Sequence, residues 1–404
     1  MNKTQKTLLV PMMIMIGMFS VLGFAVGIDA FFIPFVKKAF GISNTMSYLV
    51  LTATYSSFVI FSVPSGVLIK RVGYKGGMVS AFGLLAVSFF LVGLAANMHN
   101  YPLFLGALFV NGMGRVLLNA AVNPYITILG PTESAAKRIS IMGISNKISY
   151  AVASLILAMF LNLSDVRMED TTVPFYIIAA IVLVMGLASF FAPLPDIKAE
   201  GEDASADETV SKNVAAANSK KSILQLPHLV LGVLAYFFYT GVEVTALSSI
   251  NHYASELGLS NPQNYVWYAS GSMIIGYILG VILIPKRLSQ IMALRLSAAL
   301  GIVLCIVILL VPSNISIYFV ALFGLANALI LPAIWPLSLA DLGKFTKLGS
   351  GLLVMGGLGG GIIPLVYGIM VDAISSSQLA YIVCLLPYVF ILYFGLHGYK
   401  LRAK

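Results

Sequence analysis

The stretch NGMGRVLLNAAVNPYITILG, from Asn111 to Gly130, carries the most informative pattern in the chain. It lies within an apolar run that begins near residue 103 and is long enough to cross a bilayer. Polar residues recur in it at every fourth position: Asn111, Arg115, Asn119 and Asn123. Because four residues advance a helix by about 400°, these side chains form one polar stripe on an otherwise apolar helix.

Arg115 limits how this helix can be placed. An arginine at the centre of a membrane helix costs roughly 2.5–3.5 kcal/mol on insertion scales. We therefore expect Arg115 to face protein or a water-filled cavity rather than lipid. Two interpretations remain open at this point: a buried structural ion pair, or a polar stripe that lines a substrate pathway.

The composition around this stretch is that of a polytopic membrane protein. Hydrophobic residues make up 59% of the chain and charged residues only 10%, whereas a soluble domain has about 25% charged residues. The net charge of +9 does not predict nucleic-acid binding, because the basic residues are scattered over loops between apolar segments. Two cysteines within apolar runs and four histidines without metal-ligand spacing predict no metal site, and no cofactor is expected.

Twelve segments have the length of a membrane span, six on each side of a polar stretch. They are residues 8–36, 46–69, 77–97, 102–129, 142–164, 174–195, 225–254, 265–285, 290–312, 315–340, 350–373 and 379–398. This pattern predicts an all-α membrane protein with twelve transmembrane helices in a 6+6 arrangement. Residues 1–195 and 223–404 are the two predicted six-helix bundles. The cytoplasmic linker 196–222 lacks Trp, Tyr and Phe, so we expect a flexible tether.

Lysine and arginine predict the orientation. With the N-terminus inside the cell, 19 of the 24 basic residues lie in inside segments and 3 in outside segments. The other two, Arg115 and Lys147, lie within spans. This bias predicts that both termini and the linker are cytoplasmic.

Several motifs resemble the fucose/glucose/galactose–proton symporters of the major facilitator superfamily. They are VNPYITILGP (Val122–Pro131), PSGVLIKRVGYKGG (Pro64–Gly77), YTGVEV (Tyr239–Val244) and LGKFTKLGSGLLVMGGLGGG (Leu342–Gly361). The resemblance implies the 6+6 major facilitator fold, with the substrate near the bilayer midplane between two rocking halves. It also implies a secondary transporter of the bacterial inner membrane that imports a monosaccharide or sugar derivative, with protons as the coupling ion. We expect a monomer in the lipid bilayer.

The chain departs from the family pattern at residues that bear on coupling and substrate. Members usually have Asp four residues before the first-span proline, where this chain has Ala30, with Asp29 one position earlier. A family Glu is replaced by Asn119, and a fifth-span Gln is replaced by Gly143. Lys147 adds a cation in the fifth span. These departures leave proton coupling and a neutral hexose substrate open.

Four ionisable residues lie deep in predicted spans: Asp29, Arg115, Lys147 and Glu243. Such residues are by default candidates for ion or substrate pathways. Asp29 and Arg115 form the natural ion pair within the first bundle. Glu243 has no cation in the spans of its own half, so Glu243 and then Asp29 are our candidates for proton coupling.

The remaining candidates suit a sugar. Amide side chains offer donors and acceptors that match hydroxyl groups, and aromatic rings offer flat apolar faces. The predicted substrate-binding residues are Asn119, Asn123, Asn146, Arg115, Lys147, Asn251, Trp335 and Asn327. Tyr236, Tyr239 and Trp267 are further candidates for a flat face.

Three alternatives are open. The first keeps the fold but has an acidic sugar, a sialic acid or a uronate, held by Arg115 or Lys147. The second is an exporter of amphipathic compounds, for which a more apolar cavity is expected. The third is a membrane sensor without transport, for which a signalling domain is expected. An enzyme is not predicted, since the chain has no Walker A lysine motif and no metal-spaced histidine pair.

Overall fold

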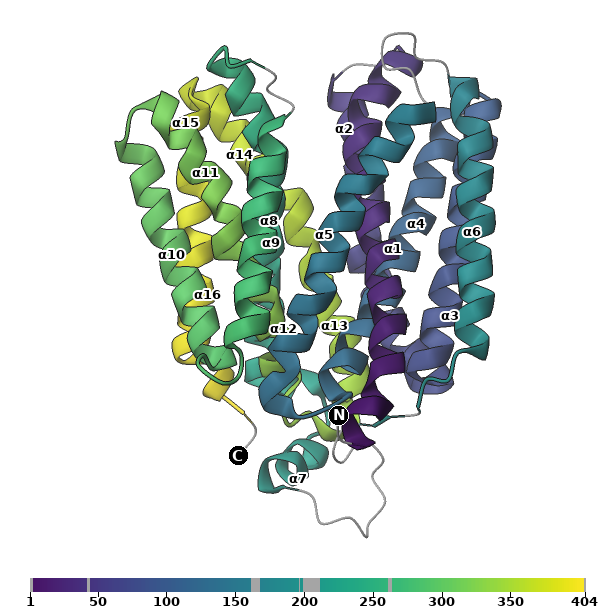
Figure 1. Cartoon of the computed structure of the whole chain (residues 1–404), viewed down its shortest axis with the longest axis vertical. Coiled ribbons are helices and arrows are strands. Elements are labelled where there is room, and N and C mark those ends of the chain that lie inside the picture. The colour runs from purple at the N-terminus through teal and green to yellow at the C-terminus, as the bar shows by residue number, and fades with distance from the viewer. Residues whose placement is uncertain are drawn as a thin grey trace. The chain divides into compact units, whose positions relative to one another are not determined.

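The computed structural model describes residues 3–41, 44–160, 168–195, 197–198, 211–260 and 264–402. Regular structure in these residues is helical (Figure 1). The α-helices are α1 (Lys3–Ala39), α2 (Asn44–Ile60), α3 (Ser62–Asn97), α4 (Tyr101–Ile128), α5 (Ala135–Phe160), α6 (Thr172–Phe191), α7 (Lys212–Ser219), α8 (Pro227–Glu256), α9 (Tyr265–Leu283), α10 (Gln290–Leu310), α11 (Ser313–Ala328), α12 (Ile330–Leu339), α13 (Thr346–Val354), α14 (Gly359–Ile374), α15 (Ser377–Ala380) and α16 (Leu385–Leu396).

The all-α membrane class is confirmed. Ten segments of the described chain are long and apolar enough to cross a membrane, two fewer than the twelve predicted. The predicted spans 46–69 and 142–164 are not among the ten; they coincide with α2 plus the start of α3 and with α5. α2 has only 17 residues, and a span needs about 20.

The predicted loop between the second and third spans is reduced to a kink. α3 runs for 36 residues, and only Gly73 inside it has non-helical angles, φ 76° and ψ 173°. A positive φ is easy for glycine and costly for other residues. The helix therefore changes direction at Gly73 without an extended loop.

Prolines and glycines break two of the later spans. α11 ends at Ala328 and α12 begins at Ile330, so the tenth span breaks just before Pro332. A proline clashes with the carbonyl four residues earlier, here that of Ala328, which explains the position of the break. The eleventh span consists of α13, a 3₁₀ turn at Met355–Leu358 and α14.

Contacts within the chain define two compact units. Unit 1 consists of Met1–Tyr125 and Ser145–Ile197, and unit 2 of Ile126–Ile144 and Lys198–Lys404. This grouping places residues 126–144, from the end of α4 to the first part of α5, with the second half of the chain. The predicted bundle boundaries at 195 and 223 stay a prediction.

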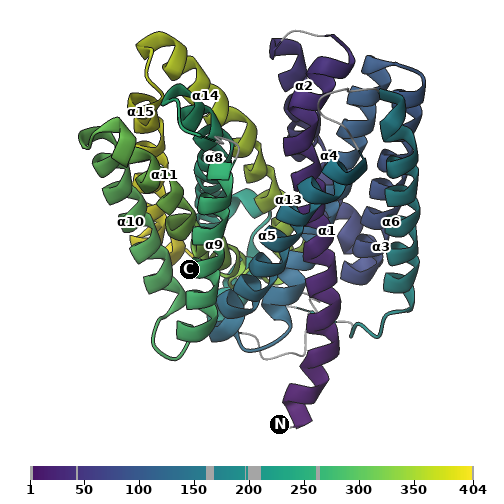
Figure 2. The same ribbon diagram turned by 45° about the horizontal axis from the view of Figure 1, so that its top comes forward.

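In unit 1, close helix contacts depend on small residues. A side chain at Gly23 in α1 would lie 2.0 Å from the carbonyl oxygen of Asn146 in α5, and one at Gly27 would lie 2.4 Å from that of Tyr150. α3 and α6 lie side by side, as both views show (Figures 1 and 2). Glycine thus lets helix backbones approach each other as is common in membrane proteins.

In unit 2, α8 is the helix around which the others gather. It packs against α9, α11, α12, α14 and α16. A side chain at Gly356 or Gly359 would lie 2.6 Å or 1.8 Å from backbone atoms of α8. This glycine run therefore allows close helix packing, and Thr240 reinforces it by donating to the Gly356 carbonyl at 3.0 Å.

The linker is partly ordered, which the tether interpretation did not predict. Residues 212–219 form α7, with Val214 and Ala217 buried against the turn that follows α12. Lys344 donates its backbone N–H to Asn218 Oδ1 at 2.8 Å and its Nζ to the Asn218 carbonyl at 2.6 Å. α7 is therefore anchored on unit 2, and the linker residues 199–210 lie outside the described part of the chain.

Candidate functional site

The polar stripe of α4 is internally hydrogen-bonded. Arg115 Nε donates to Asn111 Oδ1 at 2.7 Å, and its Nη2 donates to the Ala25 carbonyl of α1 at 3.0 Å. Asn119 Nδ2 donates to the Arg115 carbonyl at 3.0 Å, and Asn123 Nδ2 donates to Asn119 Oδ1 at 3.1 Å. Arg115 and Asn123 are buried and Asn119 is half-buried, so Asn119 is the most exposed of the three predicted binding residues on this helix.

The candidates of the fifth span, Asn146 and Lys147, lie on α5 in unit 1, as the stripe does. Asn146 is half-buried and donates to the Phe19 carbonyl at 3.2 Å. Lys147 is only 7% exposed, and its Nζ lies 5.9 Å from the centroid of the Tyr150 ring, within cation–π range. The polar residues of α4 and α5 both have partners on α1, as the Ala25 and Phe19 contacts show.

One predicted partner of Arg115 lies outside the described side chains. Asp29 falls within α1, but its side chain is not part of what the structure describes. The predicted ion pair between Asp29 and Arg115 stays a prediction, as does a coupling role for Asp29.

Unit 2 contains an aromatic group next to Glu243. Tyr236, Tyr239 and Glu243 lie on α8, and Trp335 lies on α12, which packs against it. The rings of Tyr236 and Tyr239 are stacked with centroids 6.1 Å apart, and Trp335 meets Tyr236 edge-on at 5.9 Å. Glu243 is half-buried and lies within electrostatic reach of the Tyr239 hydroxyl.

Polar atoms in this group lack hydrogen bonds. Tyr239 Oη, Trp335 Nε1 and Ser338 Oγ are buried and have no hydrogen-bond partner among the described residues. A buried polar group without a partner costs about 1–3 kcal/mol, so such atoms are commonly completed by water or by a ligand. Donors and acceptors beside aromatic faces are the chemistry that holds a sugar hydroxyl and the apolar side of its ring.

Other predicted binding residues are occupied by contacts within the fold. Asn327 is buried in α11, and its Oδ1 accepts a hydrogen bond from Tyr388 on α16 at 2.9 Å. Asn251 Oδ1 accepts from the Val266 backbone N–H at 2.9 Å, which caps the first turn of α9. Trp267 is 41% exposed. Their part in substrate binding stays a prediction, and the contacts give Asn327 and Asn251 structural roles.

Sequence reasoning missed Tyr277 and Ser338. Tyr277 on α9 is 2% exposed and lies within electrostatic reach of Glu243. Ser338 on α12 faces Gly232 on α8, where a side chain would lie 2.1 Å from the Ser338 hydroxyl. Tyr277 and Glu243 stand on different spans, so no local pattern brings them together. Ser338 follows Trp335 by three residues, and that helical spacing was the available signal.

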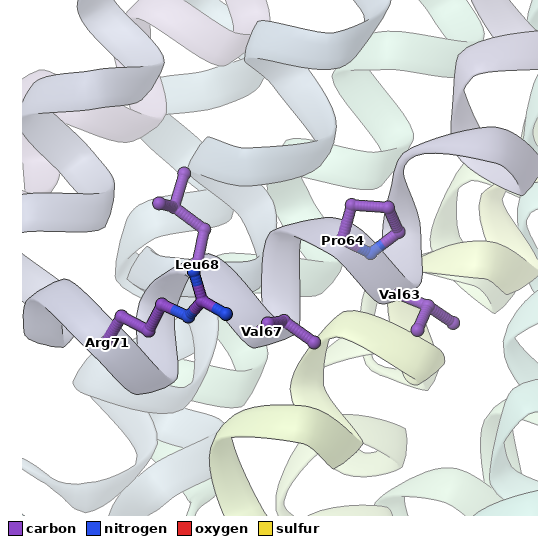
Figure 3. A pocket seen from close by; sticks show the side chains of 5 residues that line it. All are labelled: Val63, Pro64, Val67, Leu68 and Arg71. Atoms are coloured by element: carbon purple, nitrogen blue, oxygen red, sulfur yellow. The ribbon is translucent and has the colours of Figure 1, made fainter.

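A separate shallow groove lies on α3 in unit 1. Val63, Pro64, Val67, Leu68 and Arg71 line it, with a volume of about 330 Å³ (Figure 3). None of the predicted site residues lines this groove. Within the described residues, no group of three or more His, Cys, Asp or Glu side chains is placed to hold a metal ion.

The fold and these sites define a class of protein. The chain has membrane-spanning helices in two units. Ionisable side chains lie within its spans, together with polar and aromatic groups of the kind that bind sugars. These are features of a secondary transporter. The model of the Major Facilitator Superfamily matches residues 13–364.

Known proteins narrow the class. The chain is 33% identical over 395 residues to a glucose/galactose transporter of Brucella abortus, covering 95% of this chain and 92% of that protein. It is 26% identical to the L-fucose-proton symporter of Escherichia coli, covering 96% and 93%. The crystal structure of the transporter FucP in the outward conformation matches with a TM-score of 0.79 and 25% identity, covering 96% and 98%.

The chain belongs to the Major Facilitator Superfamily, in the fucose/glucose/galactose–proton symporter family indicated by its motifs. The family and the major facilitator fold predicted from the sequence are therefore confirmed. So is the prediction that the chain is not an enzyme, because its relatives are transporters.

Proposed function

We propose that this protein imports a monosaccharide or sugar derivative across a bacterial inner membrane, with protons as the coupling ion. The relatives named for glucose and galactose transport and for fucose–proton symport support both parts of the proposal. Both termini are cytoplasmic in this proposal, following the distribution of lysine and arginine. The protein acts as a monomer in the bilayer.

The observation that carries the proposal is the group around Trp335 in unit 2. Among the described residues, buried Trp335 Nε1 and Tyr239 Oη have no hydrogen-bond partner, and both belong to side chains that contact the Tyr236 ring. A sugar offers hydroxyls to such atoms and C–H faces to such rings. In unit 1, the amide side chains of the α4 stripe are separate candidates for sugar contacts, with Asn119 as the half-buried member.

Glu243 is our first candidate for the coupling proton. It is half-buried within a span and lies close to Tyr239, one turn earlier on α8. A carboxylate that can take up a proton next to the substrate contacts has the position that symport requires. Asp29 is the second candidate, from its place in the sequence alone.

The geometry of Arg115 does not favour the acidic-sugar alternative. Its Nε and Nη2 donate to Asn111 and to the Ala25 carbonyl, so these donors are already engaged. Lys147 packs near the Tyr150 ring. No observation in the described structure favours an exporter, and membership in a family of transporters argues against a sensor.

Uptake into proteoliposomes tests the proposal directly. Purified protein is reconstituted, and accumulation of neutral and acidic sugars is measured with and without an inward proton gradient. We expect a neutral monosaccharide to be concentrated only with the gradient and to be displaced by other neutral sugars. Competition by acidic sugars alone would overturn the neutral-sugar proposal, and accumulation that ignores the gradient would overturn proton coupling.

A further inference from the structure

The α12–α13 turn, residues 340–345 in unit 2, has an unusual backbone. Two of its residues have left-handed angles, Asp341 with φ 58° and Gly343 with φ 51°. Glycine adopts this conformation readily, whereas it is uncommon for an aspartate and costs free energy. A residue in such a conformation persists where its surroundings fix it. The contacts of the turn therefore tell what keeps it in this shape.

Helix α7 of the linker contacts the turn at two points, one near each end of the helix. Asn213 Nδ2 donates to Asp341 Oδ2 at 3.1 Å. Asn218 Oδ1 accepts the Lys344 backbone N–H at 2.8 Å, and a Cβ atom at Gly343 would lie only 2.3 Å from that oxygen. Lys344 Nζ donates to the Asn218 carbonyl at 2.6 Å. Asn218 thus lies directly against the left-handed glycine.

Helix α7 and the turn depend on each other. Val214 and Ala217 are buried, and Val214 Cγ1 would lie 3.1 Å from a Cβ atom at Gly343. The Ser211 side chain caps the helix by accepting the Val214 backbone N–H. A helix of eight residues is not stable alone in water, so α7 forms because it packs against the turn.

The chain end and the start of α8 hold other positions of the turn. Arg402 Nη1 donates to Asp341 Oδ2 at 2.6 Å, in an ion pair whose side chains are 30% and 21% exposed. His228 Nε2 lies 2.9 Å from the Ala340 carbonyl, and this nitrogen is the donor because a carbonyl only accepts. The His228 backbone N–H donates to the Leu401 carbonyl at 3.2 Å. The turn is therefore attached to α7, to α8 and to the chain end.

The turn directly follows the helix that carries Trp335. α12 has ten residues, a break separates it from α11, and Ala340 comes directly after its last residue. Along its side, Ser338 lies against α8, where a Cβ atom at Gly232 would lie 2.1 Å from its hydroxyl. This contact fixes the distance of α12 from α8. The turn fixes how far α12 extends along α8, and thereby where Trp335 meets Tyr236.

We propose that Asn218 is a positioning residue for the sugar site. Through Asn218, α7 holds the α12–α13 turn, and the turn keeps α12 at the level where Trp335 lies beside Tyr236. Loss of this contact loosens the turn, lets Trp335 leave its place and lowers sugar affinity. The linker then has a role beyond joining the two halves of the chain. The proposal rests on the proposed function, because it takes the group around Trp335 as the sugar site.

The environment of Trp335 can be measured without sugar. The purified full chain carries Trp267→Phe, so that Trp335, which is fully buried, is its sole tryptophan. Adding Asn218→Ala removes the acceptor of the Lys344 N–H. We expect the emission to shift to longer wavelengths and acrylamide quenching to increase about twofold, because the ring becomes more exposed. Adding Asn218→Asp should leave both unchanged, because a carboxylate accepts the same backbone N–H.

Sugar affinity is measured in the chain that retains Trp267. The probes are radiolabelled glucose, galactose and fucose, the sugars in the names of its relatives. We expect Asn218→Ala to weaken the affinity by about threefold to fivefold and Asn218→Asp to bind like the parent protein. Ser219→Ala is the matched control on α7, since its exposed hydroxyl donates to the Ala216 carbonyl within the same helix.

A second control separates positioning from a general loss of stability. Gln378 on α15 donates to the carbonyls of Ile308 and Val311 at 2.7 Å each, and α15 lies at the end of unit 2 opposite α7 (Figure 1). Gln378→Ala should lower the temperature of unfolding in detergent and leave Trp335 emission and sugar affinity unchanged. Changes in Gln378→Ala as large as those in Asn218→Ala would overturn the positioning role.

The two measurements also separate this proposal from the proposed function. If the parent protein binds sugar, unchanged affinity in Asn218→Ala, or an equal loss in Asn218→Asp, would overturn the role of Asn218 and keep the proposed function. If the parent protein binds none of the sugars, the proposed function fails. The emission of Trp335 then decides the link alone: a shift in Asn218→Ala supports it, and parent-like emission overturns it.

Discussion

Trp335 meets Tyr236 edge-on, with ring centroids 5.9 Å apart and an angle of 67° between the ring planes. This geometry leaves the Trp335 Nε1–H buried and without a hydrogen-bond partner in the described structure. Edge-to-face pairs are favourable in themselves, so the aromatic contact does not require that donor. The N–H is therefore available to a ligand that reaches the group.

Trp335→Phe should weaken sugar binding and leave the fold intact. The substitution keeps an aromatic ring in α12 and removes the donor, and a lost hydrogen bond of about 1 kcal/mol corresponds to roughly a fivefold weaker affinity. The chain has only one other tryptophan, Trp267, which is 41% exposed. Affinity is measured with radiolabelled sugar, with exposed Tyr318→Phe as the control. Trp267→Phe makes Trp335 the sole tryptophan, so that quenching of its fluorescence reports a ligand bound near Trp335. Full affinity in Trp335→Phe would remove this N–H from the site.

The stripe on α4 gives a second prediction. Asn119→Ala and Asn123→Ala should reduce sugar affinity by about fivefold to tenfold, since each removes an amide that can hydrogen-bond a hydroxyl. Asn123→Ala also removes its contacts to Asn119, at 3.1 Å each, so we expect some loss of thermal stability in that variant. Both affinities are measured on purified protein, with exposed Asn314→Ala as control. Unchanged affinity in both variants would exclude the stripe from the site.

Hydropathy and spacing were sufficient to predict most of the fold. Apolar runs of span length and the bias of basic residues follow from the bilayer itself, which acts on every span in the same way. The kink at Gly73 was predicted as a loop, because PSGVLIKRVGYKGG has the composition of a loop. Its backbone is helical on both sides of Gly73. α7 was missed because its helix depends on burial of Val214 and Ala217 against a distant turn.

The candidate site was predictable only as single residues. Trp335, Tyr239 and Glu243 stand out in the sequence because polar groups in spans are rare. Their grouping depends on α12 packing against α8, which no local pattern reveals. Gly143 is a second example. The sequence shows only that this position has no side chain, whereas the structure shows that the ring of Tyr277, from another span, fills the space beside it.

Arg138 supports the end of α4, and its replacement should be costly. Its guanidinium donates to the carbonyls of Ile126, Pro131 and Thr127 at 2.8, 2.9 and 2.7 Å, and to Ser134 Oγ at 2.7 Å. Arg138→Lys replaces a five-donor fork by three donors on one atom and leaves carbonyls without partners, so we expect a loss of about 1–3 kcal/mol. Thermal unfolding in detergent measures it, with the neighbouring Lys137→Arg as control. A stability equal to that of the parent protein would contradict this role.

The charge of Arg138 should not make stability depend on pH near neutrality. Burial lowers the pKa of Arg138 to about 10, whereas an unfolded arginine has an unperturbed value near 12.5. Between these two pKa values, the unfolded chain keeps the proton on Arg138 and the folded chain does not. In that pH range Arg138 therefore makes the stability of the fold rise with pH. Below about pH 9 both states are protonated, and the contribution of Arg138 should be constant. A difference between the parent and Arg138→Lys that changes from pH 6 to pH 8 would contradict this expectation.

The last prediction concerns the coupling proton. Glu243→Gln keeps the shape of the side chain and imitates the protonated carboxyl group. This variant should still bind sugar and exchange it across the membrane, but it should not concentrate sugar against a gradient, because it has no proton to release. Counterflow and gradient-driven accumulation in proteoliposomes separate the two activities, with exposed Asp372→Asn as the control carboxylate. If Glu243→Gln still accumulates sugar in a pH-dependent way, Asp29→Asn is the next variant. Normal accumulation by both variants would show that the protein is a uniporter or uses another ion.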